Sequence, residues 1–239
     1  MKKRYFTLVE LLVVVGIVVI LAGLVLPAVI GGAQQGRITQ AKSDMKAIQM
    51  ALAQMDQTYG RILKTTGSGN SMHSVFYTDD GNSSVNVNVT EKDDKAGASG
   101  SKTYSIILDS NSTDNKKAYN SFIAELTGTG KCGSNKFLKY QHNLRKIKFL
   151  DPNTNFDPAI EYNASTNIPY LWRDPWGNPY VIIINVDGKE RIARPDNNNK
   201  FIMGKTALYS YGPNGENDNG SNASEGGTKL QDDIATWHK

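Results

Sequence analysis

Cysteine and histidine are scarce in this sequence of 239 residues. The single cysteine, Cys132, leaves no partner for a disulfide within the chain. The three histidines are far apart, and no HExxH, CxxC, GxSxG or GKS/T motif occurs. These absences argue against the familiar zinc, hydrolase and nucleotide-binding sites, and we expect the protein not to be an enzyme.

A strong excess of charge of one sign is also missing. Lysine and arginine number 27 against 23 acidic residues, and three of the positive charges stand together at residues 2–4. A nucleic-acid-binding protein shows a clustered basic face, whereas the basic run at 136–148 is more typical of a solvated surface. We therefore expect no nucleic-acid partner.

One long hydrophobic run is present, at residues 11–30, and it contains no charged side chain. As a helix it would span the hydrocarbon core of a bilayer, which is about 30 Å thick. The positive residues 2–4 before it favour a cytoplasmic N-terminus. We expect a single-pass anchor, with the remaining chain exported.

Glu10 stands at the start of this apolar segment and does not fit a plain anchor. A carboxylate inside a membrane helix costs about 2.5–3.5 kcal/mol, so it requires a partner. No lysine, arginine or histidine occurs between residues 6 and 35. Either Glu10 lies at the headgroup level in water, or another chain supplies a cation.

The segment KKRYFTLVELL, residues 2–12, resembles the leader of the type IV pilin superfamily, which includes the pseudopilins of type II secretion. The resemblance implies that a prepilin peptidase cleaves between Tyr5 and Phe6 and methylates the new amine. It also implies that this amine pairs with Glu10 of a neighbouring subunit. Pro27 stands where the family has a helix-breaking proline, and Tyr5 stands where the family has glycine before the cut.

An amphipathic pattern follows the hydrophobic run. Apolar residues recur at helical spacing through Ile38, Ala41, Met45, Ile48, Leu52, Met55 and Tyr59. Gly60 suits a C-cap. The pattern predicts one helix over residues 6–59, about 80 Å long at 1.5 Å per residue, whose stripe packs on the protein's own head.

The remaining chain predicts a small head of strands. In the polar middle segment we expect strands at 74–78, 84–90 and 103–108 and a helix at 119–127. In the C-terminal segment, strands at 180–186, 189–194 and 206–211 predict a three-stranded meander that covers the helix. Trp176, in the turn DPWGNPY at 174–180, is interpreted as a core plug.

The strings DPWGNPY, LYSYGPNG and DDIATW together resemble the C-terminal half of the major pseudopilin of type II secretion. That family holds a calcium ion between the loop after the last strand and the acidic stretch before the final tryptophan. The resemblance implies ligands at Tyr211, through its backbone carbonyl, and at Asn214, Asp232 and Asp233. Carboxylate, amide and carbonyl oxygens are the ligands that calcium prefers. Asp218 and Glu216 are further candidates, and a polar loop without metal is the alternative.

We accordingly expect an α+β, pilin-like fold, in which a long N-terminal helix with a membrane-spanning first half packs on a small antiparallel sheet. The expected segments are a leader (1–5), an assembly helix (6–30), its amphipathic half (31–60), a variable loop-rich insertion (61–150) and a β-sheet head with the calcium loop (151–239).

The two resemblances imply a structural subunit of a type II secretion pseudopilus that drives protein export. Its partners would be other pseudopilin subunits, the prepilin peptidase and the inner-membrane secretion platform. It would lie in the bacterial inner membrane with its head in the periplasm. A minor pseudopilin or a type IV pilin is the nearest alternative, and a membrane-anchored exported enzyme or binding module is a remote one.

Overall fold

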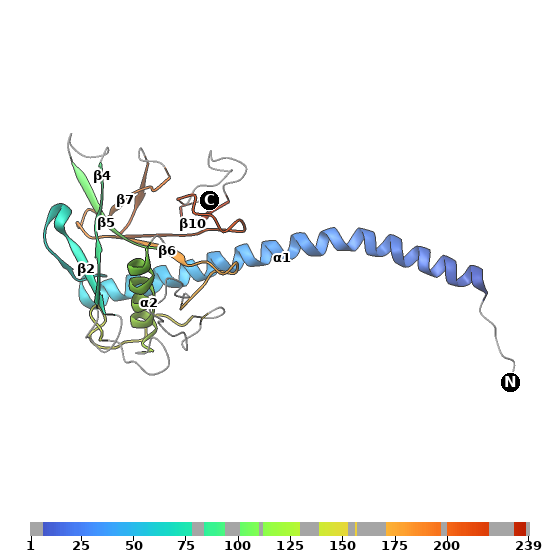
Figure 1. The fold of residues 1–239 in the computed structure, drawn as a ribbon, viewed down its shortest axis with the longest axis horizontal. Coiled ribbons are helices and arrows are strands. Elements are labelled where there is room, and N and C mark those ends of the chain that lie inside the picture. Colours follow the sequence, from blue (N-terminus) through green and yellow to red (C-terminus); the bar gives the residue numbers. More distant parts are fainter. Residues whose placement is uncertain are drawn as a thin grey trace. The chain divides into compact units, whose positions relative to one another are not determined.

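The protein is an α+β chain with a long N-terminal helix and antiparallel sheets (Figure 1). The computed structural model describes residues 7–77, 84–93, 101–109, 112–129, 139–152, 156, 171–196, 200–219 and 232–237, with the backbone alone for residues 24–31. The chain divides into two compact units, Met1–Thr39 and Gln40–Lys239, which are described separately.

The first unit is made by helix α1, Leu8–Tyr59, up to Thr39. The predicted helix is confirmed, and it continues without interruption through Pro27. Its large apolar side chains from Leu8 to Leu21 are between 52% and 79% exposed. Within the residues whose side chains the structure describes, no helix is both long and apolar enough to cross a membrane.

The second unit is the head, and residues 40–59 of α1 belong to it. The predicted apolar stripe is confirmed, because Ala41, Met45, Ile48, Leu52 and Met55 are at most 1% exposed. The stripe ends where the helix ends: residue 60 has φ +69°, a left-handed conformation that glycine adopts without a steric cost, and its N–H donates to the Asp56 carbonyl at 2.7 Å.

A five-stranded antiparallel sheet covers this stripe, in the order β10-β9-β6-β5-β4. Its strands are β4 (Thr90–Asp93), β5 (Lys102–Leu108), β6 (Tyr180–Asn185), β9 (Thr206–Ser210) and β10 (Ile234–Ala235). Every residue of β6 is buried, as expected for a strand with neighbours on both edges and cover on both faces. The Tyr180 hydroxyl donates to Asp44 of α1 at 2.8 Å, so this face of β6 lies on the helix.

The predicted three-stranded meander is wrong. The strand expected at 189–194 appears as β7 (Arg191–Ala193), which pairs with β8 (Phe201–Met203) in a separate two-stranded sheet. The neighbours of β6 are instead β5 and β9. The turn after β6 is held by β5: Val186 N–H donates to the Tyr104 carbonyl at 3.0 Å, and Tyr104 N–H donates to the Asp187 carboxylate at 3.0 Å. These bonds fix Asp187 beside β5, so the chain does not fold straight back on β6.

The middle of the chain contributes to the same head. The predicted strands appear as β2 (His73–Tyr77), β3 (Ser84–Asn88) and β5, and a short β1 (Thr65–Thr66) completes a second sheet in the order β1-β2-β3. A 3₁₀ turn, Gly69–Ser71, precedes β2. Because β5 pairs with both β4 and β6, segments 61–150 and 151–239 together form the five-stranded sheet.

Helix α2, Thr113–Thr127, packs against β2, β3 and β5. It begins earlier than the predicted residue 119 because the Ser112 hydroxyl caps it, accepting the Asn115 N–H at 3.1 Å. Buried Glu125 near its end accepts the N–H groups of Gln141, His142 and Asn143 at 2.7–3.0 Å. These bonds anchor the following loop. Residues 144–148 are exposed, in agreement with a solvated surface, while residues 136–138 of the basic run lie outside the described residues.

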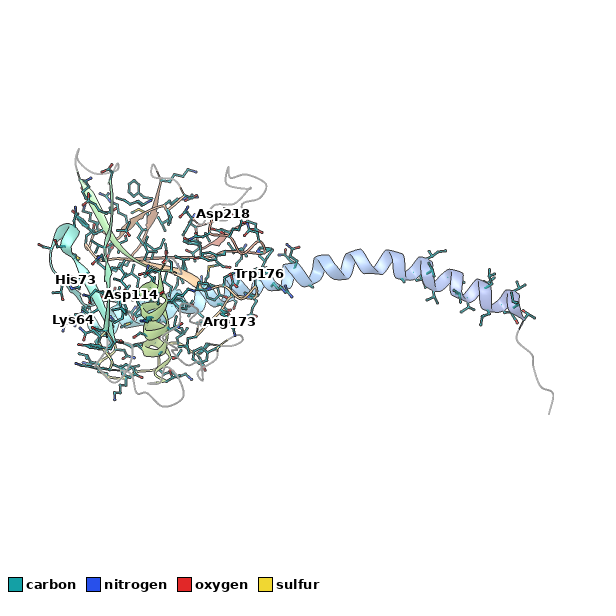
Figure 2. All side chains as sticks on the ribbon, viewed as in Figure 1. Lys64, His73, Asp114, Arg173, Trp176 and Asp218 are labelled. Atoms are coloured by element: carbon teal, nitrogen blue, oxygen red, sulfur yellow. The ribbon has the colours of Figure 1, made fainter. Side chains whose placement is uncertain are left out.

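The prediction that Trp176 plugs the core is also wrong. Trp176 is only half-buried (Figure 2). The tryptophan that fills the core is Trp172, which is fully buried and packs edge-on against Tyr180 with ring centroids 5.8 Å apart. The turn at 174–180 places Trp176 at the surface because its prolines and glycine reverse the chain there.

Candidate functional site

The C-terminal loop of the head brings together most of the predicted metal ligands. Strand β10 pairs with β9 so that Ile234 lies opposite Ser210 and Ala235 opposite Tyr209. This register places Asp232 and Asp233 beside the loop that follows β9. The Asn214 N–H donates to the Asp232 carboxylate at 3.2 Å, which fixes two of the predicted residues against each other.

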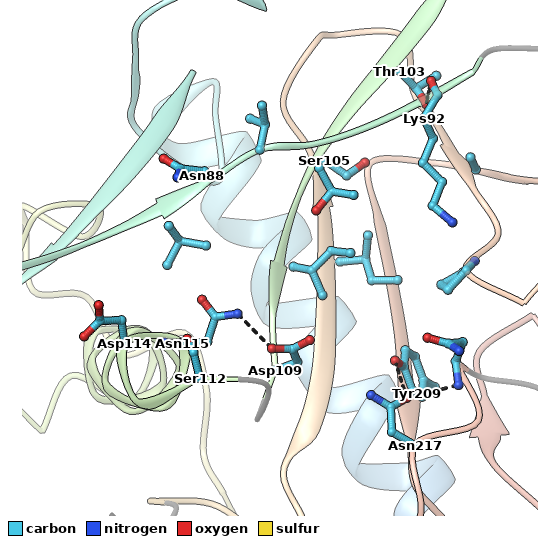
Figure 3. A pocket seen from close by; sticks show the side chains of 18 of the residues that line it. Asn88, Lys92, Thr103, Ser105, Asp109, Ser112, Asp114, Asn115, Tyr209 and Asn217 are labelled. Atoms are coloured by element: carbon cyan, nitrogen blue, oxygen red, sulfur yellow. Dashed lines mark hydrogen bonds between the residues drawn. The ribbon is translucent and has the colours of Figure 1, made fainter. Parts of the chain in front are cut away.

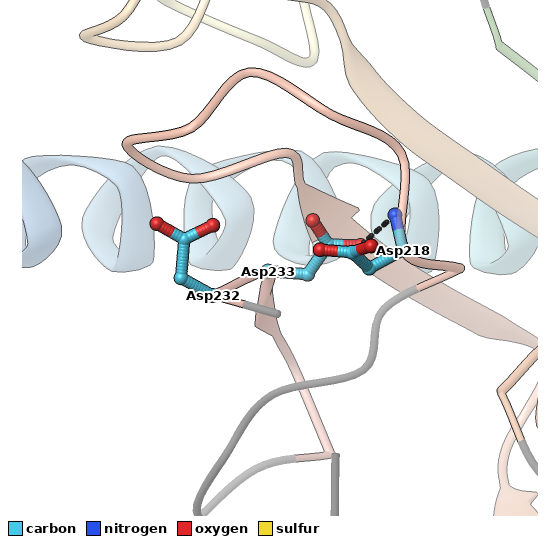
Figure 4. A group of neighbouring side chains, drawn as sticks. All are labelled: Asp218, Asp232 and Asp233. Atoms are coloured by element: carbon cyan, nitrogen blue, oxygen red, sulfur yellow. Dashed lines mark hydrogen bonds between the residues drawn. The ribbon is translucent and has the colours of Figure 1, made fainter. Parts of the chain in front are cut away.

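A third carboxylate, Asp218, completes a cluster (Figure 4). One oxygen each from Asp218, Asp232 and Asp233 lies within 4.8 Å of the other two. The Asp218 N–H donates to Asp233 at 3.1 Å, and the Asn214 side-chain amide donates to Asp218 at 3.4 Å. No other group of three or more potential metal ligands occurs within the described ranges.

The electrostatics of this cluster favour a cation. Partial burial raises the pKa of Asp232, and the charges of Asp218 and Glu216 raise it further, against the opposing hydrogen bond from Asn214. Within the described part of the head, the buried Oδ1 atom of Asp232 accepts no hydrogen bond. A buried acceptor of this kind costs free energy unless it is paired or binds a metal.

This donor set fits a calcium ion. Calcium takes six to eight oxygen ligands in flexible geometry, and the loop offers three carboxylates and the Asn214 amide. Tyr211, the predicted carbonyl ligand, is the first residue after β9. Glu216 donates its N–H to the Asn214 side chain at 2.7 Å, so that amide oxygen already holds one hydrogen bond. From the sequence, Asp218 is only a further candidate ligand. Its spacing from Asp232 does not show that the loop folds back and brings the two carboxylates together.

The turn at 174–180 is hydrogen-bonded to the residues at the start of the same loop. Buried Asp174 accepts the N–H groups of Trp176 and Asn178 at 3.0 and 2.8 Å, and the Ser210 hydroxyl at 2.7 Å. Ser210 in turn accepts the Gly212 N–H at 3.2 Å. Burial raises the pKa of Asp174, and these hydrogen bonds oppose the rise. The DPWGNPY turn and the acidic loop are therefore one connected structure.

Glu10 has a local partner in the described chain. Its carboxylate accepts both the N–H and the hydroxyl of Thr7 at 2.8 Å, and its own N–H donates to the Thr7 hydroxyl at 3.2 Å. This reciprocal pattern is a capping box, which satisfies donors at the start of a helix. The T-x-x-E spacing could have predicted it from the sequence.

The remaining predicted residues are only partly described. Tyr5 and Phe6, the expected cleavage site, lie outside the described residues, and so does Cys132. Pro27 lies within α1, but its side chain is not among those described.

Comparison with known proteins gives one local similarity. The chain is 53% identical over 51 residues to a protein named "Type II secretion system core protein G" from Pseudomonas aeruginosa. The matched stretch is 21% of this chain and spans 36% of that protein's length. No family model matches, and no solved structure matches. The similarity supports a relationship to the pseudopilins of type II secretion.

Proposed function

We propose that the protein is a structural subunit of a type II secretion pseudopilus, which polymerises through its N-terminal helix to drive protein export. The observation that carries the proposal is the local identity of 53% to a type II secretion core protein, together with the leader-like segment at residues 2–12.

Processing and location follow from the same proposal. A prepilin peptidase would cut between Tyr5 and Phe6 and methylate the new amine, and the platform in the bacterial inner membrane would then assemble the subunits. The apolar run at 11–30 would span that membrane once, with the head in the periplasm. The exposed apolar side chains of α1 between residues 8 and 21 support this role, because such a surface needs lipid or other helices as cover.

Glu10 provides the charge for assembly in this proposal. Its carboxylate caps α1 through Thr7, and it would also attract the Phe6 amine of a neighbouring subunit. An ion pair in an apolar environment is stronger than one in water, so it would select the axial position of each incoming subunit.

Calcium would stabilise the head. Asp218, Asp232 and Asp233, with Asn214 and the carbonyl of Tyr211, would hold the ion. The bound ion would supply two positive charges to offset the three clustered carboxylates. The chain's own residues prepare the loop: the turn at 174–180 and the Asn214 N–H hold it beside β10.

Two variants of the capping box test the assembly role. Glu10→Gln keeps a side-chain oxygen that can cap the helix but removes the charge, since glutamine also serves in a capping box. Thr7→Ala removes the cap and keeps the charge. We expect Glu10→Gln to insert normally but to form no pseudopili in cells that express the secretion system, and Thr7→Ala to assemble. Normal assembly of Glu10→Gln would contradict the proposal.

A further inference from the structure

The head contains a cavity of about 590 Å³ (Figure 3). None of the three clustered carboxylates lines it, although Asn217 and Asn219, on either side of Asp218, do. Its size falls within the range of about 300–1,000 Å³ that is typical of small-molecule sites. It lies wholly within the second unit, between α2, β3, β5 and the loop after β9.

The cavity exists because one face of the five-stranded sheet is covered over β6 but only partly covered over β5. Side chains alternate along β6, so Tyr180 faces α1 and Ile183 faces the opposite side. On that side an apolar cluster with Ile192, Tyr209 and Trp237 covers part of the sheet. Ile107 of β5 stays partly exposed and forms an apolar floor, whereas its cross-strand neighbour Ile183 on β6 is only 1% exposed.

The walls around this floor are made of neutral polar side chains from separate parts of the chain. Figure 3 shows Asn88 and Asn115 on one side and Tyr209 and Asn217 on another. Hydroxyl groups of Ser105, Thr103 and Ser112 add further polar atoms. Amides and hydroxyls both donate and accept hydrogen bonds, so they match ligand groups that do the same.

Two contacts hold the wall groups in place. The carboxylate of Asp109, only 4% exposed, accepts the side-chain N–H of Asn115 at 2.8 Å. The Tyr209 hydroxyl donates to the Asn217 side chain at 2.9 Å. Groups fixed in this way lose little conformational freedom when a ligand binds.

The charges at the cavity disfavour an anionic ligand. Lys92 is the cationic side chain among the lining residues, and Asp109 and Asp114 are the carboxylates. A phosphate or nucleotide would therefore meet more negative than positive charge. A ligand rich in hydroxyl groups but without net charge fits both the amide walls and the apolar floor.

We propose that this cavity binds a neutral saccharide unit, with the apolar face of the sugar ring on Ile107 and its hydroxyls on the asparagine and hydroxyl walls. This inference goes beyond assembly: it gives the head a recognition site for glycan, carried on each subunit. It does not depend on polymerisation, so it can fail or succeed separately from the proposed function.

The test is titration calorimetry with the full chain in a detergent that has no sugar headgroup, in buffer containing calcium. The probes are maltose, cellobiose, lactose and N,N′-diacetylchitobiose at millimolar concentration. Asn115→Ala and Asn88→Ala remove one wall amide each, and Asn70→Ala is the matched control, because Asn70 is exposed and does not line the cavity.

We expect at least one disaccharide to bind, and its affinity to fall tenfold or more in both wall variants while Asn70→Ala binds as the original chain does. Asn88 is exposed on β3, so its variant keeps the test valid even if Asn115→Ala folds poorly. Absence of binding by all four disaccharides would overturn the inference. Binding that persists unchanged in both wall variants would overturn it as well.

Discussion

Gly212 is the residue at which the acidic loop depends most clearly on the absence of a side chain. Its φ is +69°, and a Cβ there would overlap the backbone carbonyl of Asp232. Gly60 has the same φ but open space around it. An alanine at residue 60 would therefore meet only conformational strain, whereas an alanine at residue 212 would also overlap a neighbouring atom.

We predict that Gly60→Ala lowers the free energy of unfolding by about 1 kcal/mol, the cost of a left-handed alanine. Gly212→Ala should lower it by about 3 kcal/mol or more, because Asp232 must also move. Urea denaturation of both variants measures the difference. Equal losses would mean that the loop accommodates the methyl group.

The carboxylate cluster predicts a stabilising effect of calcium. An ion that binds only the folded chain raises its stability by RT ln(1 + [L]/Kd), so the melting temperature should rise with calcium and fall with chelator. Asp218→Asn should reduce this shift, since it removes one of three clustered charges. Asp151→Asn, at an exposed carboxylate outside the cluster, is the control and should keep the full shift. An unchanged melting temperature with calcium would contradict the metal site.

His142 predicts a loss of stability in acid. Burial lowers its pKa to about 3, and the nearby charges of Arg61 and Lys64 contribute. The unfolded chain takes up this proton near pH 6.5, so the folded state loses stability as the pH falls from 6.5 towards 3. Burial raises the pKa values of Glu125 and Asp174, which stabilises the folded chain as the pH falls. A variant of His142 keeps both carboxyl groups, so their effect cancels when the two proteins are compared.

His142→Asn keeps an acceptor for the Lys64 N–H and removes the titration. Between pH 6.5 and 4.5 the original chain should therefore lose about 2 kcal/mol more than this variant. Thermal melts across that range measure the slope, with the partly exposed His73→Asn as control. Parallel slopes for the original chain and His142→Asn would contradict this, because they would mean that folding does not lower the pKa of His142.

At the scale of elements, strong local patterns predicted the structure well. The stripe from Ala41 to Met55 has a clear helical period, and the strand β6 comes from a continuous apolar run with a clear end. The pairing of strands was predicted wrongly, as a meander of 180–186, 189–194 and 206–211, because β5 and β6 are separated by a long stretch of chain and no local pattern encodes their contact. The expected return of the chain at 189–194 as a neighbour of β6 is prevented at Asp187, because the Val186 N–H and the Asp187 carboxylate bond to the backbone of Tyr104.

The contact between α1 and the sheet includes one buried polar pair, Asp44 and Tyr180, with Gln40 also donating to Asp44 at 2.8 Å. Tyr180→Phe should cost about 1–3 kcal/mol because the carboxylate loses a buried donor. Tyr77→Phe, at a partly exposed tyrosine whose hydroxyl contacts only the surface Lys139 ammonium in the described head, is the matched control and should cost little.

The double variant Tyr180→Phe with Asp44→Leu should lose less than the sum of the two single variants, since neither polar partner then remains buried without the other. Chemical denaturation of the four proteins gives the coupling energy. Strict additivity would show that the pair does not hold α1 to the sheet.

For the whole molecule, the sequence predicted an α+β chain with a long N-terminal helix, and it predicted the surroundings of the acidic loop. The resemblance named Asn214, Asp232 and Asp233, and the structure brings them together, while only the folded loop shows Asp218 as the third carboxylate. The cavity beside α2 was not predicted, because its walls come from β3, α2 and the loop after β9, which are distant in sequence.

The central proposal is that the chain is processed and assembled as a pseudopilin. The intact mass and the N-terminal peptide of the protein from its native cells test this most directly. The proposal predicts a chain that begins at methylated Phe6, because only the processed amine can pair with Glu10 of a neighbour. A chain that begins at Met1 would contradict it.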